Sequence, residues 1–117
     1  MPHSQRFPRV HRLTKSSDFE RVYRTGKLIH NEHVRIYVLV QERDAPPRLG
    51  LSVTRRLGKA SVRNRLKRWI REWFRTRQSQ LDAFEIVVQP KPPAAQLDHK
   101  ALLKSLENLV APVRPNE

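Results

Sequence analysis

Basic side chains at helical spacing are the strongest chemical signal in this chain, within the stretch "SVRNRLKRWIREWFR" at residues 61–75. Four of them recur at every fourth position and would share one face of a helix: Arg63, Lys67, Arg71 and Arg75. Like charges at this spacing destabilise a helix by roughly 0.2–0.5 kcal/mol per pair, and Glu72 is the one acidic residue in the stretch. A solvated face is the usual role of a basic helix, but a face that repels itself this strongly favours a surface that binds phosphate groups.

A long helix is expected to carry these residues, because the hydrophobic period changes from two to 3.6 after Gly58. The pattern runs to about Gln78, and its apolar stripe comprises Val62, Leu66, Trp69, Ile70 and Trp73. Arg65 and Arg68 flank the basic face, whereas the two tryptophans point to the other side. The pattern therefore predicts a helix with one buried apolar side and one basic side.

The rest of the chain divides into short elements separated by turn residues. A first helix is expected to have Ser16 or Ser17 as its N-cap and to end at Gly26. A last helix is expected to begin near Asp98 and to end before Pro112. Strands are expected at residues 34–40, 48–54 and 84–88.

This order of elements, α-β-β-α-β-α, predicts an α/β fold in which a small mixed β-sheet packs against about three helices. The length of 117 residues predicts a single domain, residues 1–117. Within it, residues 1–12 are expected to form a basic N-terminal arm, residues 13–110 the globular core and residues 111–117 a short tail.

The overall charge points to an anionic partner. Lys and Arg number 24 against 11 Asp and Glu, which gives a formal net charge of +13. A membrane surface is disfavoured because the tryptophans are expected in the core, and no apolar run is long enough to span a bilayer. The chain has no cysteine, which excludes disulfides and thiolate sites and is consistent with a cytoplasmic protein.

No catalytic or metal-binding residue is expected in the chain itself. His30 and His33, beside Glu32, have no third ligand in reach and are interpreted as surface residues. No Ser–His–Asp order, P-loop or glycine-rich nucleotide turn is present, and the chain has three glycines in total. The sequence therefore favours a binding role over a self-sufficient active site.

Three aromatic residues form a second candidate site. Phe19 and Tyr23 lie at i, i+4 on the first expected helix, and Tyr37 alternates with the apolar residues of the strand at 34–40. From the residues alone, core packing is the favoured role for such a pair.

At "RLGLSVTRRLGKASVRNRLKRWIREWFR" the sequence resembles the bacterial ribonuclease P protein family. The resembling features are a Gly-Leu-Ser-Val strand, a basic turn and then Arg-Asn-Arg at the start of the long helix. The resemblance covers about residues 9–110 and includes "DFERVYRTG" and the strand with Tyr37.

The resemblance implies a protein subunit of the endonuclease that removes the 5′ leader of precursor tRNA. The RNA subunit of that enzyme carries the chemistry and uses Mg²⁺, so the protein is expected to bind no cofactor tightly and to cleave nothing alone. Its expected partners are the ribonuclease P RNA, with one protein per RNA, and precursor tRNA.

The resemblance also implies two RNA-binding surfaces. The residues expected to face the catalytic RNA are Arg55, Arg56, Lys59, Arg63, Asn64, Arg65, Lys67, Arg68 and Arg71. The residues expected to bind the leader are Arg12, Lys15, Phe19, Tyr23, Tyr37 and Lys91. Gly50 and Ser52 would leave room for the RNA strand. At Pro90 the chain departs from the family, whose members often have a basic residue there.

The alternative is a ribosomal or architectural RNA-binding protein with no enzymatic role, since small size and high charge fit it equally. The leader cleft separates the two hypotheses, because a purely architectural protein has no need of three aromatics on one open surface.

Overall fold

The computed structural model describes residues 12–41, 45–77 and 83–113. The predicted basic arm, apart from Arg12, and most of the predicted tail therefore lie outside the described residues. The helices are α1 (Ser16–Thr25), α2 (Ala60–Thr76) and α3 (His99–Val110), with short 3-10 turns η3 (Arg55–Leu57) and η4 (Pro92–Gln96). The strands are β1 (Lys27–His30), β2 (Val34–Val40), β3 (Arg48–Leu51) and β4 (Phe84–Pro90).

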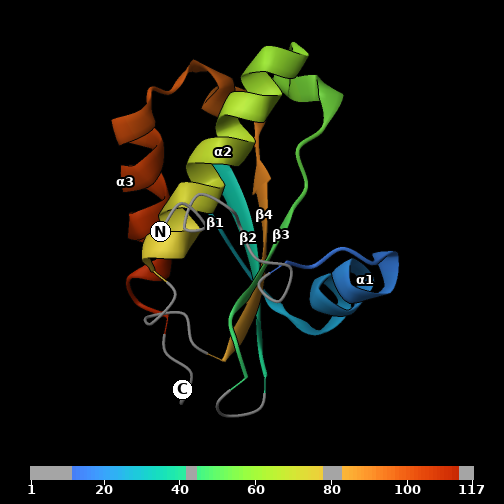
Figure 1. Ribbon diagram of the computed structural model, residues 1–117. Coiled ribbons are helices and arrows are strands. Elements are labelled where there is room, and N and C mark those ends of the chain that lie inside the picture. The colour runs from blue at the N-terminus through green and yellow to red at the C-terminus, as the bar shows by residue number, and fades with distance from the viewer. Residues whose placement is uncertain (1–11, 42–44, 78–82, 114–117) are drawn as a thin grey trace, which may run out of the picture.

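These strands form one mixed sheet with the order β1-β2-β4-β3. β1 pairs with β2 and β2 with β4 in antiparallel fashion, whereas β3 and β4 are parallel. Parallel neighbours need a crossover connection, and α2 provides it between β3 and β4. Helices α2 and α3 lie on one side of the sheet and α1 on the other (Figure 1).

The main core fills the space between the sheet and the α2–α3 side. Leu66, Ile70, Trp73 and Phe74 of α2 are buried there, against alternate residues of β2 and β4 such as Ile36 and Ile86. The predicted stripe is confirmed at Leu66, Ile70 and Trp73, and Val62 and Trp69 pack at its margin. A smaller cluster on the α1 side is centred on Leu13, Val22 and Val87.

The predicted elements are present, with four differences. β4 continues to Pro90, whereas the predicted strand ended at residue 88. β1 was not predicted, because four residues with adjacent apolar side chains show no alternation, and pairing with β2 is what defines this strand. β3 ends at Leu51 rather than at residue 54, although the Ser52 amide still donates to the Val88 carbonyl at 3.0 Å. The serine N-cap of the first helix is wrong, because Lys15 occupies that position without a side-chain cap.

The last helix behaves as predicted. Asp98 is its N-cap, and the side chain of Asp98 accepts a hydrogen bond from the Ala101 amide at 2.8 Å. α3 ends at Val110, two residues before Pro112. α2 ends at Thr76, and Gln78, its predicted end, lies outside the described residues.

Candidate RNA-binding surfaces

The exposed side of α2 is basic in its C-terminal half, from Arg68 to Arg75. Four exposed polar residues of α2 recur at helical spacing along this side. They are Asn64, Arg68, Arg71 and Arg75. Arg63 and Lys67, which were predicted to share this face, are half-buried on its flank, and the Arg63 Nε donates to the Gly58 carbonyl at 3.1 Å. The solvent-facing line therefore contains Arg71 and Arg75 as predicted, but Asn64 and Arg68 take the places of Arg63 and Lys67.

The N-terminal end of α2 extends the basic side. Lys59 is the N-cap, and no acidic residue occupies the first turn. Arg55 and Arg56 in η3 are exposed just before it, and Gly58 makes the turn between them with a φ of 118°. Because the first amides of a helix carry partial positive charge, this end attracts anions through both its backbone and its side chains.

Arg65 lies apart from the other predicted RNA-binding residues. It is half-buried, its Nη2 donates to the Ala95 carbonyl at 3.2 Å, and its guanidinium stands 5.1 Å from the ring centre of Trp69. Its buried Nε has no hydrogen-bond partner in the described part of the chain. Arg65 thus connects α2 to η4, a contact that sequence spacing does not reveal.

The three aromatic residues of the predicted leader site come together on the α1 side of the sheet. The ring centres of Tyr23 and Tyr37 are 4.9 Å apart in an edge-to-face arrangement, and those of Phe19 and Tyr23 are 6.3 Å apart. All three rings are half-buried, so they pack on the small core and keep part of their surface accessible to solvent.

The space predicted above Gly50 is occupied by Phe19. A Cβ atom at Gly50 would lie 2.8 Å from Cζ of Phe19 and 3.2 Å from Cβ of Leu13. Gly50 is buried for that reason, and the prediction that it leaves room for RNA is wrong. The role of this glycine is to let an aromatic ring lie directly on the strand.

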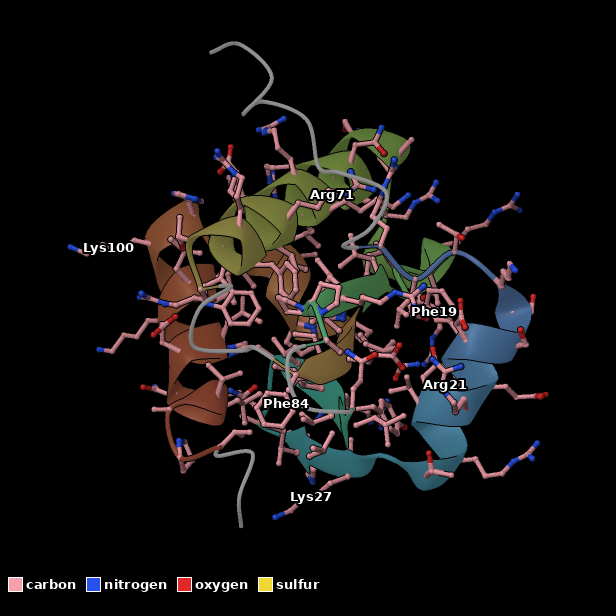
Figure 2. The ribbon with its side chains drawn as sticks, turned by 60° about the horizontal axis from the view of Figure 1, so that its bottom comes forward. Phe19, Arg21, Lys27, Arg71, Phe84 and Lys100 are labelled. Atoms are coloured by element: carbon pink, nitrogen blue, oxygen red, sulfur yellow. The ribbon has the colours of Figure 1, made fainter. Side chains whose placement is uncertain are left out.

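A pocket of about 180 Å³ joins the two candidate surfaces. It is lined by Arg12, Leu13, Thr14, Phe19, Leu49, Leu51 and Arg71. Phe19 comes from α1 and Arg71 from α2, and both are labelled in Figure 2. The main chain of Arg12 forms a parallel bridge with Leu49, so the segment before α1 lies along the β3 edge. Thr14 and Leu51 were not among the predicted site residues, although Leu51 belongs to the Gly-Leu-Ser-Val strand that carries the family resemblance.

Lys15 and Lys91, the other two predicted leader-binding cations, differ in solvent exposure. Lys15 is exposed at the start of α1. Lys91 is half-buried just after β4, and its Nζ donates to the Asn31 carbonyl at 2.5 Å. The ammonium group of Lys91 is therefore already engaged by the turn between β1 and β2.

A buried carboxylate fixes α1 to the sheet. Glu85 of β4 is 2% exposed and binds Arg21 of α1 at 2.5 Å and Arg48 of β3 at 3.0 Å. Asp18 completes the cluster with contacts of 3.1 Å to Arg21 and 3.4 Å to Arg48. The hydrogen bond with Glu85 raises the pKa of the Arg21 guanidinium above its ordinary value. Sequence reasoning missed this cluster, although a glutamate inside the apolar run "FEIVV" was its signal.

The described residues also bear on metal binding and on membrane spanning. No group of three possible metal ligands occurs among the described residues, and His33 instead lies 3.4 Å from the Ser105 hydroxyl. Within residues 12–41, 45–77 and 83–113, none of the helices has the length and hydrophobicity needed to cross a membrane.

A basic helix, an aromatic surface on the other side of a mixed sheet and a pocket between them are the features to compare with known proteins. A family model described as Ribonuclease P matches residues 7–114. The chain belongs to the ribonuclease P protein family.

Curated members of this family resemble the chain over most of their length. The ribonuclease P protein component of Listeria innocua is 39% identical over 97 residues, which are 82% of this chain and 82% of the relative. That of Staphylococcus carnosus is 35% identical over 102 residues, 87% of this chain and 89% of the relative.

Solved structures agree with this assignment. The Staphylococcus aureus RNase P protein matches with a TM-score of 0.79 and 33% identity, over 86% of this chain and 93% of that chain. The RNase P protein of Thermotoga maritima matches with a TM-score of 0.79 and 33% identity, over 88% of this chain and 97% of that chain. The predicted α/β fold is thus confirmed.

Family membership makes the chain the RNA-binding protein component of ribonuclease P, the ribonucleoprotein endoribonuclease that matures the 5′ ends of tRNA. Its partner is the ribonuclease P RNA. The alternative of a ribosomal or architectural protein with no enzymatic role is set aside by the same finding.

Proposed function

We propose that the two surfaces divide the work of the ribonuclease P protein: the basic side of α2 and η3 binds the catalytic RNA, and the aromatic side binds the leader of precursor tRNA. The single observation that carries this division is the pocket in which Phe19 of the aromatic side and Arg71 of the basic side meet. We propose that an RNA strand passes from one surface to the other at this pocket.

The basic side is suited to a folded RNA. Arg68, Arg71 and Asn64 are exposed along α2, and arginine binds phosphate oxygens through two parallel hydrogen bonds. The amide of Asn64 both donates and accepts, so it can bind a phosphate or a ribose hydroxyl without adding charge. Arg55, Arg56 and Lys59 extend this surface beyond the helix N-terminus.

The aromatic side is suited to an unpaired strand. The solvent-accessible parts of Phe19, Tyr23 and Tyr37 offer ring faces and edges to bases, with little preference for sequence. Arg12 and Lys15 are proposed to pair with phosphates. Lys91 is proposed to do so with the two N–H groups that its hydrogen bond to the Asn31 carbonyl leaves available. The leader sequence differs from one tRNA precursor to another, and a surface that binds bases by stacking tolerates this variation.

The chemistry is assigned to the RNA subunit. Mg²⁺ would be bound by that RNA and would activate the attacking water, while the protein positions the substrate through phosphate and base contacts. We further propose a single-domain protein, one copy per RNA, acting in the cytoplasm where tRNA precursors are made.

The test is reconstitution of the holoenzyme. Purified protein mixed with ribonuclease P RNA should stimulate 5′ cleavage of precursor tRNA at low Mg²⁺ concentration. Tyr37→Ala should weaken holoenzyme binding of precursor tRNA by about 1–3 kcal/mol and leave the binding of mature tRNA unchanged. Equal losses for both tRNAs would contradict a leader-binding role.

A further inference from the structure

Three polar residues form a row across the side of the sheet that faces α1, next to the aromatic residues. They are His30, Arg35 and Gln89: His30 of β1 lies opposite Arg35 of β2, and Arg35 lies opposite Gln89 of β4. Residues directly opposite each other in antiparallel strands have their side chains on the same face, about 4.5–5.5 Å apart at Cβ. Arg35 also shares its face with Tyr37, two residues further along β2.

Arg35 is the notable member of this row. Its side chain is exposed, and within the described residues it takes part in no hydrogen bond or ion pair. Three other cations of the α1 side are engaged: Arg21 and Arg48 bind Glu85, and Lys91 binds the Asn31 carbonyl. Arg35 therefore has its full donor capacity available beside the aromatic residues.

Gln89 connects the polar row to those rings. Its Nε2 donates to the Tyr23 hydroxyl at 3.3 Å, so the side chain of Gln89 leans toward the aromatic residues rather than toward Arg35. The tyrosine thereby holds the neighbour of Arg35 in place, and the guanidinium is left facing solvent. Two residues span about 7 Å along an antiparallel strand, which a long arginine side chain bridges easily.

We propose that Arg35 binds a backbone phosphate of the leader next to the base that stacks on Tyr37. The inference rests on the proposed leader-binding role of the aromatic side and adds to it a cation at the end of the sheet where Lys91 is already engaged. Arg35 is thus a substrate-binding residue, and it takes no part in bond breaking.

The experiment compares Arg35→Gln, Arg35→Lys and the control Lys104→Gln in the reconstituted holoenzyme. Lys104 is exposed on α3, on the other side of the sheet, and its substitution removes the same single charge. Dissociation constants are measured for mature tRNA and for precursors whose leaders are shortened one nucleotide at a time, at several salt concentrations.

Arg35→Gln should weaken binding of the long-leader precursor roughly three- to tenfold and flatten its plot of log affinity against log salt by about 0.7. The loss should disappear once the leader is too short to reach Arg35 and should be absent for mature tRNA. Arg35→Lys should retain most of the affinity, and Lys104→Gln should show no dependence on leader length. Thermal melts confirm that each variant is folded.

The two proposals fail in different ways. If Tyr37→Ala impairs leader binding but Arg35→Gln matches Lys104→Gln at every leader length, the role of Arg35 is overturned and the aromatic site stands. If neither Tyr37→Ala nor Arg35→Gln discriminates precursor from mature tRNA, the leader site itself is overturned, and the role of Arg35 with it.

Discussion

Arg65 and Arg68 lie three positions apart on α2 and have different surroundings. Arg68 is exposed, whereas Arg65 is half-buried against Trp69 and binds the Ala95 carbonyl. Substitution of each by alanine should therefore separate RNA binding from stability. Both were expected to face the catalytic RNA. Arg65 also makes contacts within the protein, so it should contribute more to the stability of the fold than Arg68 does.

Arg68→Ala should weaken binding to ribonuclease P RNA, flatten the salt dependence by about one unit and leave the free energy of unfolding unchanged. Arg65→Ala should lower the free energy of unfolding by about 1–2 kcal/mol, because it removes a hydrogen bond and a cation–π contact. Urea titrations and RNA binding at several salt concentrations measure the two effects. Equal stability losses in the two variants would contradict the assignment.

Gly50 makes a second residue-scale prediction. Gly50→Ala places a methyl group within 2.8 Å of the Phe19 ring and should cost about 1–3 kcal/mol of stability through overpacking. Affinity for precursor tRNA should fall at the same time, since Phe19 must move. Thermal melts and leader-dependent binding measure both.

A double variant checks the cause. Phe19→Leu removes the aromatic edge that the new methyl group would meet, so Gly50→Ala should cost much less stability in that background. If Gly50→Ala lowers the stability by the same amount with leucine at position 19, the strain does not come from the Phe19 ring.

At the scale of elements, the docking of α1 depends on one buried carboxylate. Glu85→Gln should lower the free energy of unfolding by about 1.5–3 kcal/mol, because Arg21 and Arg48 lose charge-assisted hydrogen bonds. Amide hydrogen exchange should accelerate in α1 more than in α3, and leader affinity should fall although Glu85 is buried behind the aromatic surface.

The exposed pair on the same helix is the control. Arg24 and Glu20 are 3.6 Å apart with side chains 74% and 72% exposed, so Glu20→Gln should change stability by less than about 1 kcal/mol. Uniform acceleration of exchange in α1 and α3 by Glu85→Gln would mean that the carboxylate stabilises the whole fold rather than the docking of one helix.

The elements whose pattern is local were predictable from sequence. α2 has a long amphipathic period, α3 has an aspartate cap, and β2 alternates between buried and more exposed residues from Val34 to Leu39. Each of these patterns lies in consecutive residues. β1 is not, because its strand character comes from pairing with β2. The same reason applies at the site: the aromatic spacing located Phe19 and Tyr23, but the partner of Arg65 is 30 residues away and the ring over Gly50 comes from another element.

The whole molecule carries a net charge of +13, and the folded state places Arg68, Arg71 and Arg75 together on the exposed side of α2. A multivalent anion that binds the folded state should stabilise it by mass action, by about 2.7 kcal/mol at a concentration one hundred times its dissociation constant. Millimolar pyrophosphate should therefore raise the melting temperature more than chloride at equal ionic strength. Arg68→Ala should reduce this rise, and an identical effect of both salts would exclude a specific anion site.

The protein alone should not cleave precursor tRNA at any Mg²⁺ concentration, because we propose that the RNA subunit carries the chemistry. Incubation of precursor tRNA with the protein, with the RNA and with both measures this directly. Metal-dependent cleavage by RNA-free protein would overturn the division of labour between the subunits.

The strand order β1-β2-β4-β3 also determines when the protein becomes functional during translation. β4 is the last strand to leave the ribosome, yet it lies between β2 and β3 and supplies Glu85 and Val87 to the side that holds α1. A nascent chain that ends before Phe84 has the basic residues of α2 but lacks the carboxylate that holds α1 in place. The aromatic surface is therefore assembled only after β4 has been made, when the basic residues of α2 that attract RNA are already present.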